Sequence, residues 1–130
     1  MFWRTFKWGL LWSLFIFIIC ILPVSDLPIS TFLTKIYFDK IIHAFIYMVL
    51  FFLVLKGVKT ISNYPFLITI GYCLSYGLII ELIQHFLIDG RSGEFYDVVA
   101  NSTGVIVGII IVAIIKNNKT NEPLNNLGLY

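Results

Sequence analysis

Long runs without a charged residue alternate with short polar segments along the chain, and four such runs dominate its pattern. A transmembrane helix needs about 20 apolar residues, with a range of roughly 17–25. The runs lack the strict alternation of barrel strands, and backbone groups in lipid must find their hydrogen bonds within the segment. We therefore predict an all-α membrane protein, a bundle of four transmembrane helices at about residues 8–23, 37–55, 66–88 and 97–115.

The ends of these runs carry the expected boundary signals. Pro23, Pro28 and Pro65 lie at run edges, where proline starts or stops a helix. The Asn-rich segment 116–130 is typical of a flexible polar tail, so we predict a transmembrane helical domain over residues 1–115 followed by this tail. The first run has a basic lead-in like that of a signal peptide, but it lacks a small-x-small cleavage site, which favours an uncleaved helix.

Composition supports a membrane protein and excludes several other classes. Hydrophobic residues make up 59% of the chain and charged residues 12%, whereas soluble domains have about 25% charged residues. An ordinary soluble enzyme, a nucleic-acid-binding domain and a disordered chain are therefore excluded, and a net charge of +2 is too small to indicate a polyanion partner. Cys20 and Cys73 have no zinc-site spacing and are expected to be small buried hydrophobic residues.

The distribution of Lys and Arg predicts the orientation in the membrane. The N-terminus, the middle loop and the tail together carry six of these residues, and the two remaining loops carry three. The more basic side is expected to face the cytoplasm, so both termini would be cytoplasmic.

In this topology nearly all remaining polar residues lie at the outer ends of three helices. They fall on helical stripes, with spacings of three or four residues. The stripes are Lys40, His43, Tyr47 and Leu50; Gly77, Glu81, Gln84 and Ile88; and Asp97, Asn101, Gly104 and Gly108.

Glu81 is the most informative single residue. A charged group at the centre of a membrane helix costs about 2.5–3.5 kcal/mol on insertion scales, so it persists where it faces other helices and has a partner. Arg91, Lys40 and His43 are the candidate partners. Two interpretations stay open: a buried acid in a functional site, or a polar contact that holds helices together.

The other residues of the stripes have simpler interpretations when each is considered alone. Lys40 would snorkel to headgroups, His43 would be a hydrogen-bonded packing residue, and His85 would lie at the interface. Gly104-x-x-x-Gly108 and Gly71-x-x-x-Ser75 match the small-residue pattern of close helix packing.

Taken together, the ordered set of residues resembles a known family. Asp39-Lys40-x-x-His43 with Tyr47, then Glu81-x-x-Gln84, Arg91, and Asp97-x-x-x-Asn101-x-x-Gly104-x-x-x-Gly108 are similar in order and spacing to the VanZ-like membrane proteins, over residues 39–108. The Asp-Gly-Arg lead-in at 89–91 departs from the Pro-rich approach of such sequences. The resemblance implies a small multi-pass protein of the bacterial cell (inner) membrane. The founding member is linked to teicoplanin resistance, which resemblance alone does not transfer to this chain.

The polar cluster suggests a protein that binds or modifies an envelope lipid or a lipid-linked cell-wall precursor. Glu81 or His43 would act as general acid or base, and Asp39 and Asp97 would orient them or help to hold a divalent ion. Lys40 and Arg91 would hold phosphate or carboxylate. Gln84 and Asn101 would add further hydrogen bonds to the substrate. The sequence shows no metal signature and no Ser-His-Asp arrangement, so the reaction, any cofactor and enzymatic activity itself stay open.

Two other function classes fit the same residues. In a non-catalytic envelope protein, the cluster would only fasten the helices together. In a small transporter, it would be part of an ion or proton path, although residues 46–55 and 105–115 are almost wholly apolar. An oligomer could still form a pore, and the oligomeric state does not follow from the sequence.

Overall fold

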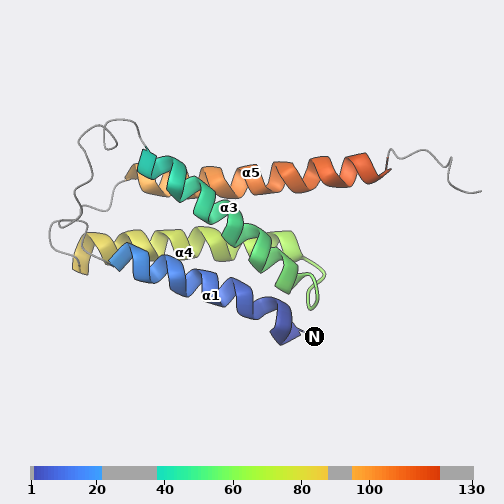
Figure 1. The fold of residues 1–130 in the computed structure, drawn as a ribbon, viewed down its shortest axis with the longest axis horizontal. Helices are drawn as coiled ribbons and strands as arrows, with labels where there is room; N and C mark the ends of the chain where they lie inside the picture. Colours follow the sequence, from blue (N-terminus) through green and yellow to red (C-terminus); the bar gives the residue numbers. More distant parts are fainter. Residues whose placement is uncertain (1, 22–37, 88–94, 121–130) are drawn as a thin grey trace, which may run out of the picture.

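The computed structural model describes residues 2–21, 38–87 and 95–120, and every regular element in these ranges is a helix. The helices are α1 (Phe2–Ile21), α3 (Phe38–Val58), α4 (Pro65–Leu87) and α5 (Phe95–Thr120) (Figure 1). The prediction of an all-α fold with four helices is confirmed.

Three of the four helices are long and apolar enough to cross a membrane. These are α3, α4 and the Phe95–Asn118 part of α5. In α1 the apolar stretch is shorter, Phe6–Ile21, although all 20 residues of the helix would extend about 30 Å at 1.5 Å per residue. The first predicted span is therefore a helix that falls short of the others in apolar length.

Helix boundaries differ from the prediction where polar residues continue a helix. The first helix begins at Phe2 instead of residue 8, and α3 runs to Val58 instead of residue 55. The exposed Lys56 lies in the last turn of α3, where the negative end of the helix dipole stabilises a cation. Likewise α5 continues to Thr120, so the predicted tail begins as helix; residues 121–130, Pro23 and Pro28 lie outside the described residues.

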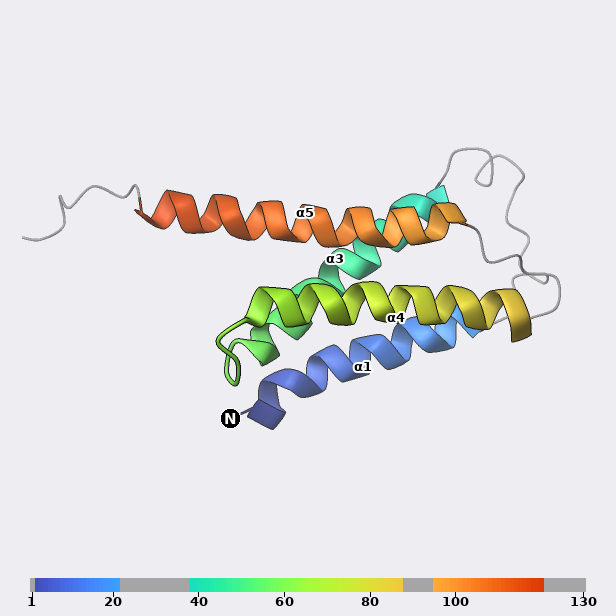
Figure 2. The same cartoon turned by 180° about the vertical axis from the view of Figure 1, so that it is seen from behind.

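Helix α3 is the central element of the described chain. It contacts α1, α4 and α5, whereas α1 and α5 make no contact with each other among the described residues. Figures 1 and 2 show α3 crossing diagonally, with its N-terminal end beside α5 and its C-terminal end beside α1. Residues along α3 are therefore positioned to meet different helices at its two ends.

The interior and the outer faces of the helices are both apolar. Leu50, Phe51, Val54 and Cys73 are buried in the core. Large apolar side chains are exposed on every described helix, for example Leu67 and Ile106. So much exposed apolar surface is unusual for a soluble monomer and is the pattern expected for helices that contact lipid. Cys20 and Cys73 are buried, as predicted.

Hydrogen bonds attach α1 to the other helices. The Trp12 Nε1–H donates to the Ile46 carbonyl oxygen of α3 at 3.0 Å. Towards α4, the Ser13 and Tyr72 hydroxyls share a hydrogen bond of 2.9 Å, and the Tyr76 hydroxyl donates to the Ser13 carbonyl oxygen at 2.5 Å. These bonds hold α1 beside the central helix.

Candidate functional site

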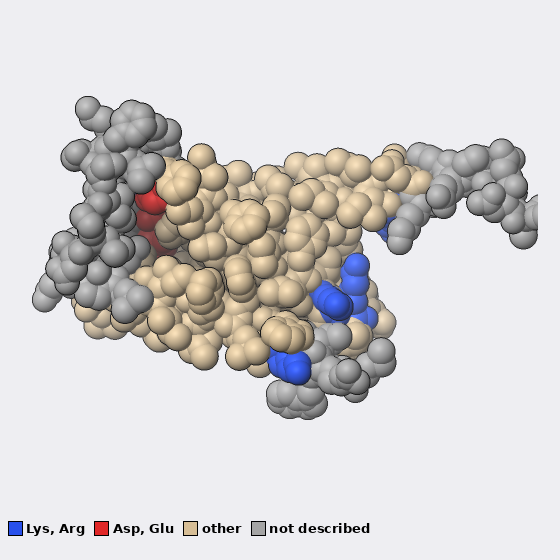
Figure 3. All heavy atoms as spheres, viewed as in Figure 1, with Lys and Arg blue, Asp and Glu red and all other residues tan. Residues whose placement is uncertain are grey.

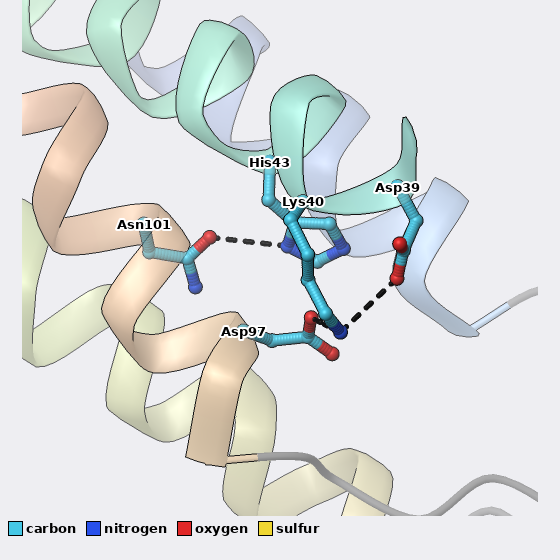
Figure 4. A network of polar contacts seen from close by, with 5 residues as sticks. All are labelled: Asp39, Lys40, His43, Asp97 and Asn101. Carbon is cyan, nitrogen blue, oxygen red and sulfur yellow. Dashed lines mark hydrogen bonds and ion pairs between the residues drawn. The ribbon is translucent and has the colours of Figure 1, made fainter. Parts of the chain in front are cut away.

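A buried ion pair joins the first turns of α3 and α5. The Lys40 ammonium bonds to an Asp97 carboxylate oxygen (Figure 4), and the two side chains are only 17% and 13% exposed. Burial at this level makes the pair much less screened by solvent than a surface pair. Each charge stabilises the other, because a largely buried charge without a partner carries a large desolvation cost.

Asp39 lies at the outer edge of this pair. One of its carboxylate oxygens is 3.1 Å from the Lys40 ammonium nitrogen, but its side chain is 61% exposed. An exposed contact of this kind adds little stability. Lys40 thus lies between a buried carboxylate and an accessible one.

One turn deeper, His43 of α3 contacts Asn101 of α5. The imidazole Nδ1 and the Asn101 Oδ1 are 3.1 Å apart (Figure 4). With the amide oxygen facing the ring, Nδ1 must be the donor, because a carbonyl oxygen only accepts. In the neutral ring Nε2 then keeps its lone pair and can accept a hydrogen bond on that side.

Helix α4 contributes two buried polar side chains at the same end. Gln84 is 2% exposed and donates from Nε2 to the Cys20 carbonyl oxygen of α1 at 3.0 Å. Glu81, almost one turn earlier, is 5% exposed and lies four residues after Gly77, on the same face of α4. The Gln84 side chain therefore joins α4 to α1, and Glu81 faces the central helix α3.

Close approach of the helices at this end depends on glycine. A Cβ added at Gly77 of α4 would lie 3.2 Å from Tyr47 Cε1 and 3.3 Å from Asn101 Nδ2. A Cβ at Gly104 of α5 would overlap the Ala44 carbonyl oxygen, and one at Gly108 would lie 2.6 Å from Phe51 Cδ1. Gly71, which has nothing within 4 Å, makes no such contact.

The structure brings together most of the residues singled out from the sequence. Asp39, Lys40, His43, Asp97 and Asn101 form one network across α3 and α5, while Glu81 and Gln84 lie buried on α4. Arg91, a predicted partner of Glu81, lies outside the described residues. His85 is exposed and its ring meets Phe86 edge-on.

Tyr47 is the residue that sequence reasoning did not select as a candidate. It is 2% exposed and lies against Gly77. The available signal was its position on the stripe of Lys40 and His43, seven residues after Lys40.

Comparison with known proteins gives one match, which covers most of the chain. The family model VanZ/LLP1 matches residues 2–116, which include all four described helices nearly completely. The chain belongs to the VanZ/LLP1 family. Searches of the curated proteins and of the solved structures give no significant match.

Charges separate along the helices of this VanZ/LLP1 protein. In Figure 3 the acidic side chains gather at one end of the molecule and the basic ones towards the other. Lys56 lies in the last turn of α3, and the neighbouring Gly57 packs against Phe6 near Lys7. Asp39 and Asp97 lie in the first turns of α3 and α5. The candidate site therefore lies at the end opposite to these lysines.

The chemistry available to this VanZ/LLP1 site is that of proton transfer and hydrogen bonding to oxygen. His43 offers a ring nitrogen, Glu81 a buried carboxylate, and Lys40 an ammonium between two carboxylates. Within the described ranges, no three His, Cys, Asp or Glu side chains are arranged to hold a metal ion. Asp39 and Asp97 instead share Lys40.

Proposed function

We propose that this VanZ/LLP1 protein binds or modifies an envelope lipid or a lipid-linked cell-wall precursor at the outer leaflet of the bacterial inner membrane. The observation that carries the proposal is the buried polar network at one end of α3, α4 and α5, which contains both charges of Lys40 and Asp97. Ionisable groups in membrane-spanning segments are expensive, and they mark functional sites by default.

The proposed orientation rests on the separation of charge. Lys and Arg favour the cytoplasmic side, and Lys7, Lys56 and Lys59 lie in the N-terminal helix and at the junction of α3 and α4. With both termini cytoplasmic, the ends of the helices that carry Asp39 and Asp97 face outward. A role in glycopeptide (teicoplanin) susceptibility would follow from a change in the envelope molecules that such a drug meets.

In the proposed site each residue has one chemical task. Glu81 and His43 would transfer protons, and Asp39 and Asp97 would orient Lys40 and the ligand. Lys40 and Arg91 would bind the polar headgroup, and Gln84 and Asn101 would add further hydrogen bonds to the substrate. Asp97 already holds Lys40, so a phosphate that reaches Lys40 would share the ammonium with it.

A non-catalytic structural role is the second candidate, and a specific observation favours it. The bond of Gln84 to the Cys20 carbonyl oxygen and the His43–Asn101 bond both join separate helices. Such contacts in membranes contribute about 0.6 kcal/mol on average. In this alternative, loss of a polar residue would lower stability without changing any envelope molecule.

The test compares envelope lipids and wall precursors by mass spectrometry in three strains. They express the wild type, Glu81→Gln at a matched level, or no copy of the gene. We expect Glu81→Gln to insert into the membrane normally but to lose the effect, because the amide cannot transfer a proton. His85→Gln, an exposed position one turn further along α4, is the matched control and should behave like the wild type.

The outcomes separate the two candidates. A lipid or precursor that changes only with the wild type and the His85→Gln control supports the proposal and names the substrate class. Identical profiles in all strains would favour the structural role. If Glu81→Leu kept the full effect, the assignment of Glu81 to the site would be wrong.

A further inference from the structure

Two buried hydrogen-bond donors near His43 have no partner among the described residues. They are the Tyr47 hydroxyl and the Asn101 Nδ2 amide, in side chains that are 2% and 3% exposed. A buried polar atom that makes no hydrogen bond destabilises the folded protein. Such atoms are rare in native proteins, and each requires an explanation.

The two donors converge on the same place, although they belong to different helices. An added Cβ at Gly77 would lie 3.4 Å from the Tyr47 hydroxyl oxygen and 3.3 Å from Asn101 Nδ2. Asn101 is also the residue that accepts the His43 hydrogen bond, through its other amide atom. The Asn101 donor therefore belongs to the network of Figure 4, and Tyr47 lies about one turn after His43 on α3.

Thr69 carries another buried polar group, but this group lies apart from these two donors. Its buried hydroxyl also has no hydrogen-bond partner in the described part of the chain. However, it lies eight residues before Gly77 on α4, about 12 Å along the helix. It is a single group, whereas the Tyr47 and Asn101 donors both lie beside Gly77.

The electrostatics of this position favour a neutral oxygen over an anion. Both donors are uncharged, and the acidic residue Glu81 is buried one turn after Gly77 on α4. The ammonium of Lys40 belongs to a residue seven positions earlier on α3, about 10 Å along the helix axis. A ligand whose charged headgroup meets Lys40 would therefore place a less polar part beside Tyr47.

An apolar crevice adjoins the same residues. A small cavity of about 50 Å³ between α1 and α3 is lined by both His43 and Tyr47. The rest of its wall is aliphatic side chains and one cysteine, contributed by Ile16, Ile19, Cys20, Ile42 and Ile46. A ligand whose headgroup meets Lys40 would thus find both hydrogen-bond donors and an apolar surface within the next two turns of α3.

We propose that Tyr47 and Asn101 form an inner subsite that donates two hydrogen bonds to the acyl ester carbonyl of a glycerolipid. The proposal rests on the proposed function, because it needs a lipid headgroup at Lys40. A small free anion has no acyl carbonyl to place in this subsite. A lipid whose chains are joined by ether bonds lacks this carbonyl as well. The Tyr47 hydroxyl is held without a partner in the protein because the ligand supplies that partner.

The test measures lipid binding by native mass spectrometry of the full-length protein in detergent. The probes are a diester phosphatidylglycerol and the diether analogue with the same headgroup and chain length, which lacks the carbonyls. We expect the wild type to bind the diester about three- to tenfold more tightly, the range for one or two neutral hydrogen bonds. Tyr47→Phe should lower this preference, because only the Asn101 hydrogen bond would remain, with a melting temperature that is unchanged or raised.

Two control variants separate this subsite from general effects on folding. Thr69→Val removes another buried hydroxyl that lacks a partner, and it should keep the preference for the diester. Tyr76→Phe is the same chemical change at a hydroxyl that bonds to Ser13, so it should lower stability and also keep the preference.

The outcomes distinguish failure of the subsite from failure of the proposed function. Equal binding of both lipids by the wild type, with weaker binding of both by Lys40→Met, would overturn the carbonyl subsite and leave the headgroup site intact. No binding of either lipid by the wild type would overturn the subsite together with phosphatidylglycerol as ligand; the envelope profiles of the Glu81→Gln strain then test the proposed function independently. A preference that Tyr47→Phe leaves undiminished would also overturn the subsite.

Discussion

At the scale of single residues, Lys40 connects the stability of the fold to the chemistry of the site. Its ammonium bonds to the buried Asp97 and lies 3.1 Å from the exposed Asp39. The same cation that would meet a ligand phosphate therefore also neutralises a buried acid. A functional defect in a Lys40 variant is informative only when its stability is measured as well.

Lys40→Met should lower the free energy of unfolding by about 1–3 kcal/mol, because it leaves Asp97 buried without its cation. Asp39→Asn should change it by less than about 1 kcal/mol, since that carboxylate is exposed. Denaturant titration in mild detergent measures both. A smaller loss for Lys40→Met in an Asp97→Asn background would show that the effect comes from the pair, and equal losses in both backgrounds would contradict this account.

At the scale of helices, the contact of α3 with α5 is set by glycine on one side. Gly104 packs directly on the Ala44 backbone, and Gly108 on the Phe51 ring. This contact places Lys40 opposite Asp97 and His43 opposite Asn101. The geometry of the site therefore depends on how closely two helices approach each other, several residues away from the charges.

Gly104→Ala should force α3 and α5 apart, because the new methyl group would overlap a backbone carbonyl that cannot rotate away. Overpacking of this kind costs about 1–3 kcal/mol. Gly71→Ala is the matched control, since an added Cβ meets nothing within 4 Å, and we expect it to be neutral or slightly stabilising. Equal melting temperatures for the two variants would refute the close contact at Gly104.

At the scale of the whole molecule, the separation of charge and the number of spans together decide which side the site faces. Four spans put both termini on the same side, while three spans would put them on opposite sides. The helix in question is α1, whose apolar stretch is shorter than those of the other three.

Reporter fusions at Met1, Lys59 and Tyr130 test the orientation directly. With both termini cytoplasmic, a fluorescent protein should be bright at all three positions, and alkaline phosphatase should be inactive at Lys59 and Tyr130. The physical reason is the excess of Lys and Arg in these segments. Active phosphatase at Tyr130 would place the Asp39–Asp97 end in the cytoplasm and contradict the proposed outer-leaflet site.

The sequence alone determined the helical class and the approximate spans of this protein. Uncharged runs such as residues 98–115 are long, and a chain in lipid has few ways to form the hydrogen bonds of its backbone N–H and C=O groups. Helical periodicity also predicted that Lys40 and His43 share a stripe, as do Asp97 and Asn101. These properties depend on local spacing and on the solvent, so they follow from the order of residues.

Only the tertiary structure decided which stripes meet. The pairing of Lys40 with Asp97 and the isolation of the Tyr47 hydroxyl depend on the crossing of α3 with α4 and α5. Gly71 and Gly104 occur in the same kind of small-residue pattern, yet only Gly104 packs against another helix. Such contacts join residues more than 50 positions apart, and which faces come together is set by the packing of all four helices at once rather than by any single segment.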